Sequence, residues 1–193
     1  MEKIILKRFK ESSEVKARFL KENLSKLLDV IKLVSHTFEA GNKLFFFGNG
    51  GSAADAQHMA AEFVNRYIMN RPPLPAIALT TDTSVLTSVS NDFTFSEIFA
   101  KQIRALGKER DVAIGITTTG NSPNIIKAFE VAKEMGMKTI AFTGNDGGAI
   151  GKMADFSLVV PSTSTPRIQE AHILIGHILC EMVEQSLFFK INP

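Results

Sequence analysis

Five short, continuously apolar runs recur along the chain, separated by segments with helical periodicity. The runs are KLFFFG, PAIALT, DVAIGIT, KTIAFTG and FSLVVP, at residues 43–48, 75–80, 111–117, 138–144 and 156–161. A strand that is apolar at every position is typical of a parallel sheet whose two faces are both covered by helices. The sequence therefore predicts the α/β class, with a doubly wound five-stranded parallel sheet.

Long helical segments lie outside this alternation at both ends of the chain. From about Glu14 to Ala40, apolar residues recur with the spacing of a helix that has one buried stripe. The last segment, from about Thr165 to Phe189, is apolar around most of its circumference. A helix of that kind needs more than one neighbour. We therefore expect a single domain over residues 1–193, with an N-terminal helical extension at about 1–40, whose end helices pack against other subunits.

Composition and charge exclude several classes of protein. The chain has 193 residues, enough for one core of ordinary size, and 22 Lys and Arg against 20 Asp and Glu. No basic run interleaves with aromatic residues, so we expect no nucleic-acid partner. No segment has the roughly 20 apolar residues of a membrane span, and the N-terminus lacks the apolar core of a signal peptide. Cys180, the only cysteine, excludes a disulfide framework, so we expect a cytoplasmic protein without membrane association.

Two loops rich in glycine and hydroxyl groups follow predicted strands. GNGGS, at residues 48–52, follows LFFF, and Ser52 can either cap the next helix or donate to a phosphate. TTTGNSPN, at residues 117–124, gathers the hydroxyl groups of Thr117, Thr118, Thr119 and Ser122. In open α/β sheets, ligands bind at the carboxyl ends of the strands, where helix N-termini favour anions. We therefore predict a phosphate site formed by these two loops.

Neither of two nucleotide-binding patterns is complete. GK at residues 151–152 resembles the end of a phosphate loop, but Asp146 and Met153 stand where that motif needs glycine and a serine or threonine. The first loop fits GxGxxA, yet the acidic residue nearest to the end of PAIALT, Asp82, lies about thirty residues past the glycines instead of the roughly 20 that a ribose-binding acid requires. We expect no nucleotide cofactor, and a dinucleotide-dependent oxidoreductase is a distant alternative.

Candidate acid, base and metal-binding side chains lie on two of the predicted helices. His58 and Glu62 are four residues apart and share one helix face, and Gln169 and His177 share one broad side of the last helix. Each pair alone also has an ordinary explanation, a surface pair or a hydrogen-bonded core histidine. Together they offer two imidazoles, a carboxylate and an amide oxygen, a set that can hold zinc or another divalent transition ion.

Longer stretches of the chain resemble one known family. They are GNGGSAADAQHMAAEFVNRY, RPPLPAIALTTD, SNDFTFSEIFAKQIRALG, GITTTGNSPNIIKA and PSTSTPRIQEAHILIGHILC. Over nearly the whole chain they are similar to the phosphoheptose isomerases, whose single sugar isomerase (SIS) domain has a flavodoxin-like fold with added helices. The resemblance implies a homotetramer with sites at subunit interfaces, and a phosphorylated seven-carbon sugar as substrate.

The resemblance also implies a role for each candidate residue. Glu62 and His177 would be the catalytic pair, and His58, Glu62, Gln169 and His177 would bind one zinc ion per subunit. The residues that would contact the substrate are Asn49, Gly50, Gly51, Ser52, Glu62, Asn91, Asp92, Thr117, Thr118, Thr119, Ser122 and Gln169. Because the end helices are expected to pack between subunits, we expect Glu62 and His177 to meet across a subunit boundary.

The activity that the resemblance implies is the isomerisation of sedoheptulose 7-phosphate to D-glycero-D-manno-heptose 7-phosphate by enediol acid–base chemistry. This is the first step toward the ADP- or GDP-heptose used in lipopolysaccharide and other glycans. The alternative is a SIS protein without catalysis, since some relatives bind a sugar phosphate or a replication initiator instead. The chain keeps both Glu62 and His177, which favours the enzyme.

Overall fold

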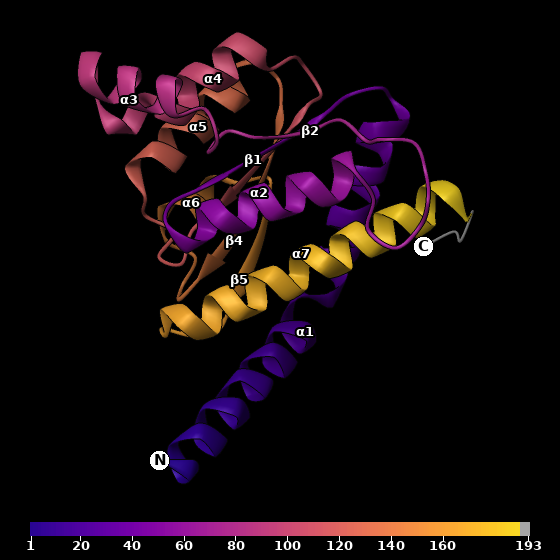
Figure 1. Cartoon of the computed structure of the whole chain (residues 1–193), viewed down its shortest axis with the longest axis vertical. Coiled ribbons are helices and arrows are strands. Elements are labelled where there is room, and N and C mark those ends of the chain that lie inside the picture. Colours follow the sequence, from indigo (N-terminus) through magenta and orange to yellow (C-terminus); the bar gives the residue numbers. More distant parts are fainter. Residues whose placement is uncertain (190–193) are drawn as a thin grey trace.

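The computed structural model describes residues 1–189 and shows a parallel sheet with helices on both faces (Figure 1). Its strands are β1 (Leu44–Gly48), β2 (Ala76–Ala78), β3 (Val112–Ile116), β4 (Lys138–Gly144) and β5 (Phe156–Val160). Its helices are α1 (Glu2–Glu39), α2 (Gly51–Val64), α3 (Thr83–Asp92), the 3-10 helix η1 (Phe95–Glu97), α4 (Ile98–Leu106), α5 (Pro123–Glu134), α6 (Gly148–Met153) and α7 (Thr165–Phe188). Within residues 1–189, no helix combines the length and the apolar character needed to cross a membrane.

The five strands run parallel, in the order β2-β1-β3-β4-β5. Leu44 pairs with Val112 and Gly48 with Ile116, so β1 and β3 end at the same level. After β1 the chain first adds β2 on one side and then builds β3 to β5 on the other. A reversal of this kind leaves a crevice at the carboxyl ends of the two strands where it occurs. The predicted five-stranded sheet is confirmed, and its crevice lies beside the two glycine-rich loops.

Alternate residues of the strands belong to two separate cores, one on each face of the sheet. On β1, Leu44 and Phe46 join the core formed with α1, α2 and α7. Phe45 and Phe47 join the core formed with α4, α5 and α6. All four side chains are fully buried. The strands are therefore apolar at every position because helices cover both faces of the sheet.

The N-terminal helix is longer than its apolar pattern predicts. The buried stripe is predicted from about Glu14 within an extension at about 1–40, and α1 begins at Glu2 and has 38 residues. Figure 1 shows its first turns projecting beyond the body of the molecule. This part has no buried stripe, and pairs of opposite charge about one turn apart support it instead, such as Arg8 with Glu11 at 2.8 Å and Lys10 with Glu14 at 3.8 Å. A search for buried periodicity could not locate its start.

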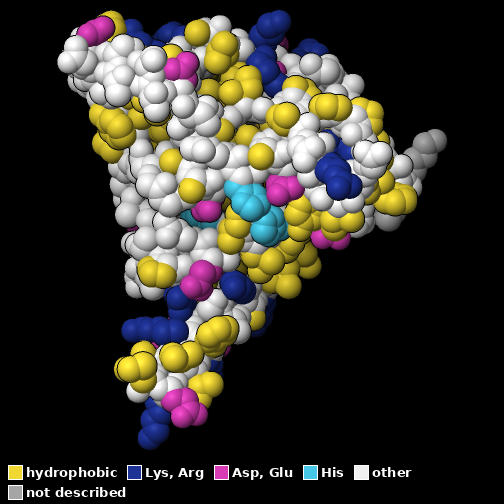
Figure 2. All heavy atoms as spheres, viewed as in Figure 1, with side chains coloured by type: hydrophobic (Ala, Val, Ile, Leu, Met, Phe, Trp, Pro, Cys, Tyr) yellow, Lys and Arg dark blue, Asp and Glu magenta, His cyan; other side chains and the backbone are white. Residues whose placement is uncertain are grey.

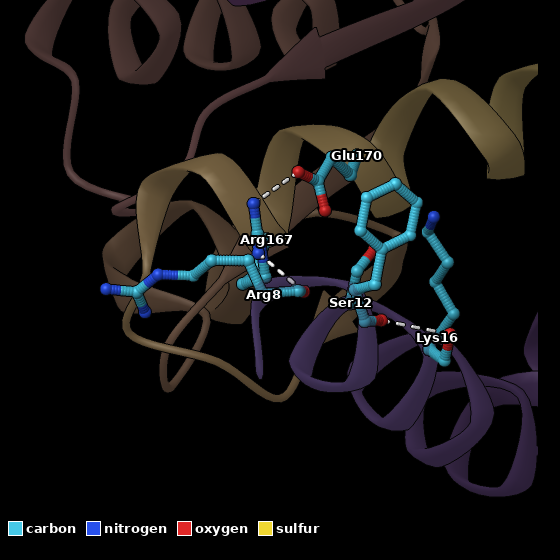
Figure 3. Close-up of a pocket in the computed structure, with 7 residues that line it drawn as sticks. Arg8, Ser12, Lys16, Arg167 and Glu170 are labelled. Carbon is cyan, nitrogen blue, oxygen red and sulfur yellow. Dashed lines mark hydrogen bonds and ion pairs between the residues drawn. The ribbon is translucent and has the colours of Figure 1, made fainter. Parts of the chain in front are cut away.

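An arginine at the start of α7 fastens this projecting part of α1 (Figure 3). Arg167 donates from Nη1 to the backbone carbonyl of Arg8 at 2.9 Å, and from Nη2 to the Glu170 carboxylate at 2.5 Å. Its side chain is largely buried between the two helices. The bond therefore fixes α1 to the end of α7 that adjoins the glycine-rich loops.

Candidate active site

A cavity of about 330 Å³, which we call the loop pocket, opens at the carboxyl ends of β1 and β3. The residues that line it are Asn49, Gly50, Gly51, Ser52, Ile116, Thr117, Thr118, Thr119, Ser122, Thr165 and Gln169. The structure thus brings together the hydroxyl groups of the two predicted phosphate-binding loops. None of the lining side chains carries a formal charge, so an anion here would be held by hydroxyl, amide and backbone groups.

Three helix N-termini meet at the loop pocket. α2 begins at Gly51, Ser122 directly precedes α5, and α7 begins at Thr165. The first N–H groups of a helix have no partner within that helix and carry partial positive charge. Three such ends around a pocket without a carboxylate are well suited to a phosphate group.

Hydrogen bonds hold the two loops in fixed positions. Thr117 Oγ1 and Ser122 Oγ lie 3.1 Å apart, which closes the second loop. The side-chain amides of Asn49 and Asn124 pair reciprocally, at 3.0 and 2.8 Å, and join the first loop to the start of α5. Asn124, which is buried, is not among the residues predicted from the sequence. The signal that could have found it is its place at the end of the TTTGNSPN motif.

Gln169 packs over the first loop and forms one wall of the loop pocket. A Cβ atom on Gly51 would lie 2.5 Å from Gln169 Nε2, so any side chain at position 51 would displace the Gln169 amide from its present position. By contrast, Asn91 and Asp92 are exposed at the end of α3, bonded to each other at 2.9 Å, and line no part of the loop pocket. The structure places Gln169 with the predicted phosphate-binding residues and leaves Asn91 and Asp92 apart from them.

The predicted acid and base residues form a second cluster, on α2 and α7. His58 Nε2 lies 3.1 Å from His177 Nε2 and 3.2 Å from Glu62 Oε1. Figure 2 shows histidine side chains together at the surface of this face of the molecule. One chain therefore brings His177 to the His58–Glu62 pair. The expectation that Glu62 and His177 meet across a subunit boundary is wrong.

A close approach of α2 and α7 explains this arrangement. A Cβ atom on Gly176 would lie 2.4 Å from Sδ of Met59, so the absence of a side chain at position 176 lets the two helices pack tightly. Met59 and Gly176 are the sequence neighbours of His58 and His177. The contact that packs the helices therefore also brings the two imidazoles together.

Both contacts of this cluster are made by one atom, since His58 Nε2 lies 3.2 Å from Glu62 Oε1 and 3.1 Å from His177 Nε2. Among residues 1–189, no group of three or more His, Cys, Asp or Glu side chains is arranged to hold a metal ion. Gln169 lies eight residues before His177 on α7, about 12 Å along the helix axis. The predicted zinc set of His58, Glu62, Gln169 and His177 therefore stays a prediction.

Asp55 is a further carboxyl group beside the cluster, to which the sequence analysis gave no role. It lies one turn before His58 on α2, and its Oδ2 is buried without a hydrogen-bond partner in the described part of the chain. Burial raises the pKa of this carboxyl, and the neighbouring His58 and His177 act in the opposite direction. The Asp55 carboxyl therefore lies within the electrostatic influence of both imidazoles.

Comparison with known proteins gives consistent results. A family model described as the SIS domain matches residues 8–144. The phosphoheptose isomerase of Thermodesulfovibrio yellowstonii is 54% identical over 184 residues, which cover 95% of this chain and 92% of that protein. The phosphoheptose isomerase of Aquifex aeolicus is 52% identical, over 95% of this chain and 96% of its own length. The structure of a phosphoheptose isomerase from Francisella tularensis has a TM-score of 0.92 and 42% identity, and the match covers 95% of this chain and 97% of that one.

The parallel sheet, the loop pocket at its crevice and the matching family model define a SIS-domain protein. Within this class the chain belongs to the phosphoheptose isomerase family, since it shares about half of its residues with members over nearly their full length. It is therefore an isomerase, as the resemblance implied.

Proposed function

We propose that the chain interconverts sedoheptulose 7-phosphate and D-glycero-D-manno-heptose 7-phosphate through an enediol. The observation that carries this proposal is the presence of two sites along α2, the uncharged loop pocket at its start and the cluster of Glu62, His58 and His177 further on. Ser52 and His58 are six residues apart, about 9 Å along the helix axis. A sugar whose phosphate occupies the loop pocket can extend its far, reacting carbons toward the cluster.

The reaction moves a proton between adjacent carbons, so it needs a base at carbon, an acid at oxygen and a substrate that is held still. In our proposal Glu62 removes the proton from C1 while His177 protonates the carbonyl oxygen on C2. The enediol then collapses when Glu62 returns the proton to C2 and His177 accepts the proton of the O1 hydroxyl. His58, bonded to both side chains, keeps them oriented.

The experiment that tests this function is NMR of the purified protein with sedoheptulose 7-phosphate in deuterated water. We expect the aldose product to appear with deuterium at the carbon next to its carbonyl, because a carboxylate that carries the proton exchanges it with solvent. Binding without turnover would contradict the proposal and favour a SIS protein that only binds a sugar phosphate.

The loop pocket yields a prediction about substrate affinity. Thr118→Val and Ser122→Ala each remove a hydroxyl group that can donate to the phosphate, and hydrogen bonds to a charged group are worth roughly 1.5–3 kcal/mol. We expect each variant to raise KM about tenfold or more, with an unchanged melting temperature. Ser25→Ala, an exposed serine on α1, is the control. Wild-type KM in both loop variants would place the phosphate elsewhere.

We further propose that one zinc ion per subunit binds at His58, Glu62, Gln169 and His177. The support is the chemistry of the donors, since imidazole and carboxylate are usual zinc ligands. His58 Nε2 lies 3.1 Å from His177 Nε2 and 3.2 Å from Glu62 Oε1. When bound, such an ion polarises a carbonyl oxygen. Gln169, the fourth residue of the set, lies eight residues before His177 on the same helix.

Elemental analysis is expected to find about one zinc ion per chain. Chelation should abolish activity, added zinc should restore it, and His58→Ala should lower the zinc content of the purified protein. His36→Ala is the matched control, because His36 is exposed on α1, where it pairs with Glu39. Full activity in thoroughly demetallated protein would remove the ion from the mechanism.

We also propose a homotetramer whose sites border the subunit interfaces, with the whole chain as one SIS domain and α1 as its extension. Its support is exposed apolar surface of a kind that marks protein contacts. The exposed apolar residues of α1 and α7 include Ile4, Ile5, Leu6, Phe9, Leu20, Leu24, Leu28 and Leu174. α7 also carries His177, so subunits that cover this helix would lie beside the cluster. The buried free thiol of Cys180 suits a reducing, cytoplasmic location.

A further inference from the structure

We infer that Tyr67 is a positioning residue for His177, and that the buried pair of Arg71 and Glu184 holds Tyr67 in place. The inference rests on the proposed catalytic role of His177. Tyr67 lies in the segment between α2 and β2, at residues 65–75, which contains no helix or strand. A residue in such a segment keeps a fixed position only when specific contacts hold it there.

The ring of Tyr67 lies against the imidazole of His177. Their centroids are 5.7 Å apart and their planes are inclined by 30°, close to a stacked arrangement. The ring of His58 lies on His177 as well, with a centroid distance of 5.1 Å and an angle of 55°. His177 therefore has two aromatic neighbours, of which only Tyr67 lies outside the proposed proton-transfer and zinc-binding set.

The carboxylate of Glu184 anchors the segment that carries Tyr67. The backbone N–H groups of Tyr67 and Ile68 donate to it at 3.0 and 3.1 Å, and that of Met69 donates to it too. Glu184 is buried, and it lies two turns after His177 on α7. One helix therefore presents the imidazole and also anchors the backbone of the residue that stacks on it.

Arg71 ties the same segment to the end of α2. Its Nε donates to Glu184 at 3.0 Å, its Nη2 to the carbonyl of Glu62 at 2.9 Å and its Nη1 to that of Phe63 at 2.8 Å. A guanidinium group at these carbonyls satisfies the free acceptors of a helix C-terminus. Its side chain is only 2% exposed, as is that of Glu184. A single buried ion pair thus connects the backbone of Glu62, the Tyr67 segment and the helix of His177.

The ion pair provides orientation that apolar packing would not. Burying two charges is expensive, and replacing such a pair by apolar residues is often neutral or stabilising. Burial would raise the pKa of the Glu184 carboxyl, but hydrogen bonds from Met69, Tyr67, Arg71 and Ile68 hold it below its ordinary value, so the carboxylate stays charged. Hydrogen bonds from four donors are directional, so they fix the orientation of the segment. Apolar contacts are not directional and would allow it to shift.

The test compares kcat and KM of five proteins: the wild type, Tyr67→Leu, Tyr67→Phe, Asn70→Ala and His177→Ala. Tyr67→Leu is expected to lower kcat about tenfold with KM within about twofold, because it removes the stacked ring and leaves the loop pocket intact. Tyr67→Phe keeps the ring and should stay within about twofold of the wild type. Asn70→Ala, at an exposed position in the same segment, is the matched control.

The outcomes separate this inference from the proposed function. Wild-type kcat in Tyr67→Leu, beside an inactive His177→Ala, would overturn the positioning role alone, whereas an active His177→Ala would overturn the catalytic assignment of His177. An equal loss of kcat in Tyr67→Phe and Tyr67→Leu would assign the effect to the hydroxyl group and contradict the stacking argument. Glu184→Gln keeps the shape but removes the charge, and we expect it to lower kcat as well. A lower melting temperature with wild-type kcat would reduce the ion pair to a structural role.

Discussion

Replacing Glu62 with glutamine is expected to lower kcat by at least about 10²-fold. Glutamine has nearly the same shape, but its amide cannot accept a proton from carbon, and the loss of a general base typically costs this much or more. The fold should survive, because glutamine keeps the shape of the side chain and Glu62 belongs to neither apolar core. Initial rates with sedoheptulose 7-phosphate give kcat and KM, and the melting temperature checks the fold.

Two controls isolate proton transfer in this variant. Glu134→Gln makes the same chemical change at an exposed carboxylate on α5, paired only with Arg104, and should leave kcat unchanged. Zinc content is measured in parallel, since Glu62 is also a proposed zinc ligand. A kcat within tenfold of the wild type would remove Glu62 from the mechanism.

The single-chain geometry of the cluster adds a sharper expectation for mixed subunits. Glu62 and His177 are joined through His58 within one chain. If Glu62→Gln and His177→Ala subunits are dissociated, mixed and reassembled, every cluster therefore keeps one defect and activity should stay lost. Recovery of activity, with subunit exchange confirmed by mass spectrometry, would show that the working site combines residues of two chains.

The sheet and the loop pocket could be predicted from the sequence because their signals are local. A strand buried on both faces can be recognised from consecutive apolar residues, as in LFFF. A hydroxyl-rich turn can be recognised from one short motif, as in TTTGNS. The carboxyl ends of parallel strands then bring the two loops to the same edge of the sheet. No knowledge of distant contacts was needed for either conclusion.

The features that escaped prediction depend on contacts between distant segments. Asn49 pairs with Asn124 across 75 positions, and Glu184 bonds the backbone of Tyr67 across 117. No periodicity or spacing in the sequence indicates which residues form these pairs. Gly176 lies in an apolar helical pattern, and nothing in that pattern indicates its contact with Met59 of α2. For the same reason, the meeting of Glu62 and His177 within one chain could not be foreseen.

His172 is the second side chain for which a large effect is expected, this time on stability. It is fully buried on α7, and its Nε2 lies 3.0 Å from the backbone carbonyl of Thr143, so this nitrogen carries the proton and donates it. Its Nδ1 is buried without a partner in the described part of the chain. Burial lowers the pKa of this imidazole from 6.5 to about 4. The folded protein therefore keeps His172 neutral at pH values where an unfolded chain would protonate it.

The free energy of unfolding is expected to fall by about 3 kcal/mol through His172 alone as the pH drops from 6.5 to 4. Below pH 6.5 the unfolded state binds a proton that the folded state does not bind until about pH 4. The unfolded state is therefore favoured by about 1.4 kcal/mol for each pH unit between these values. His172→Gln can still donate to Thr143 but does not titrate, so the stability difference between wild type and variant should change across this range. Urea unfolding at fixed protein concentration measures it, with the exposed His36→Gln as control. A difference that stays constant from pH 7 to pH 4 would show that His172 is not held neutral by burial.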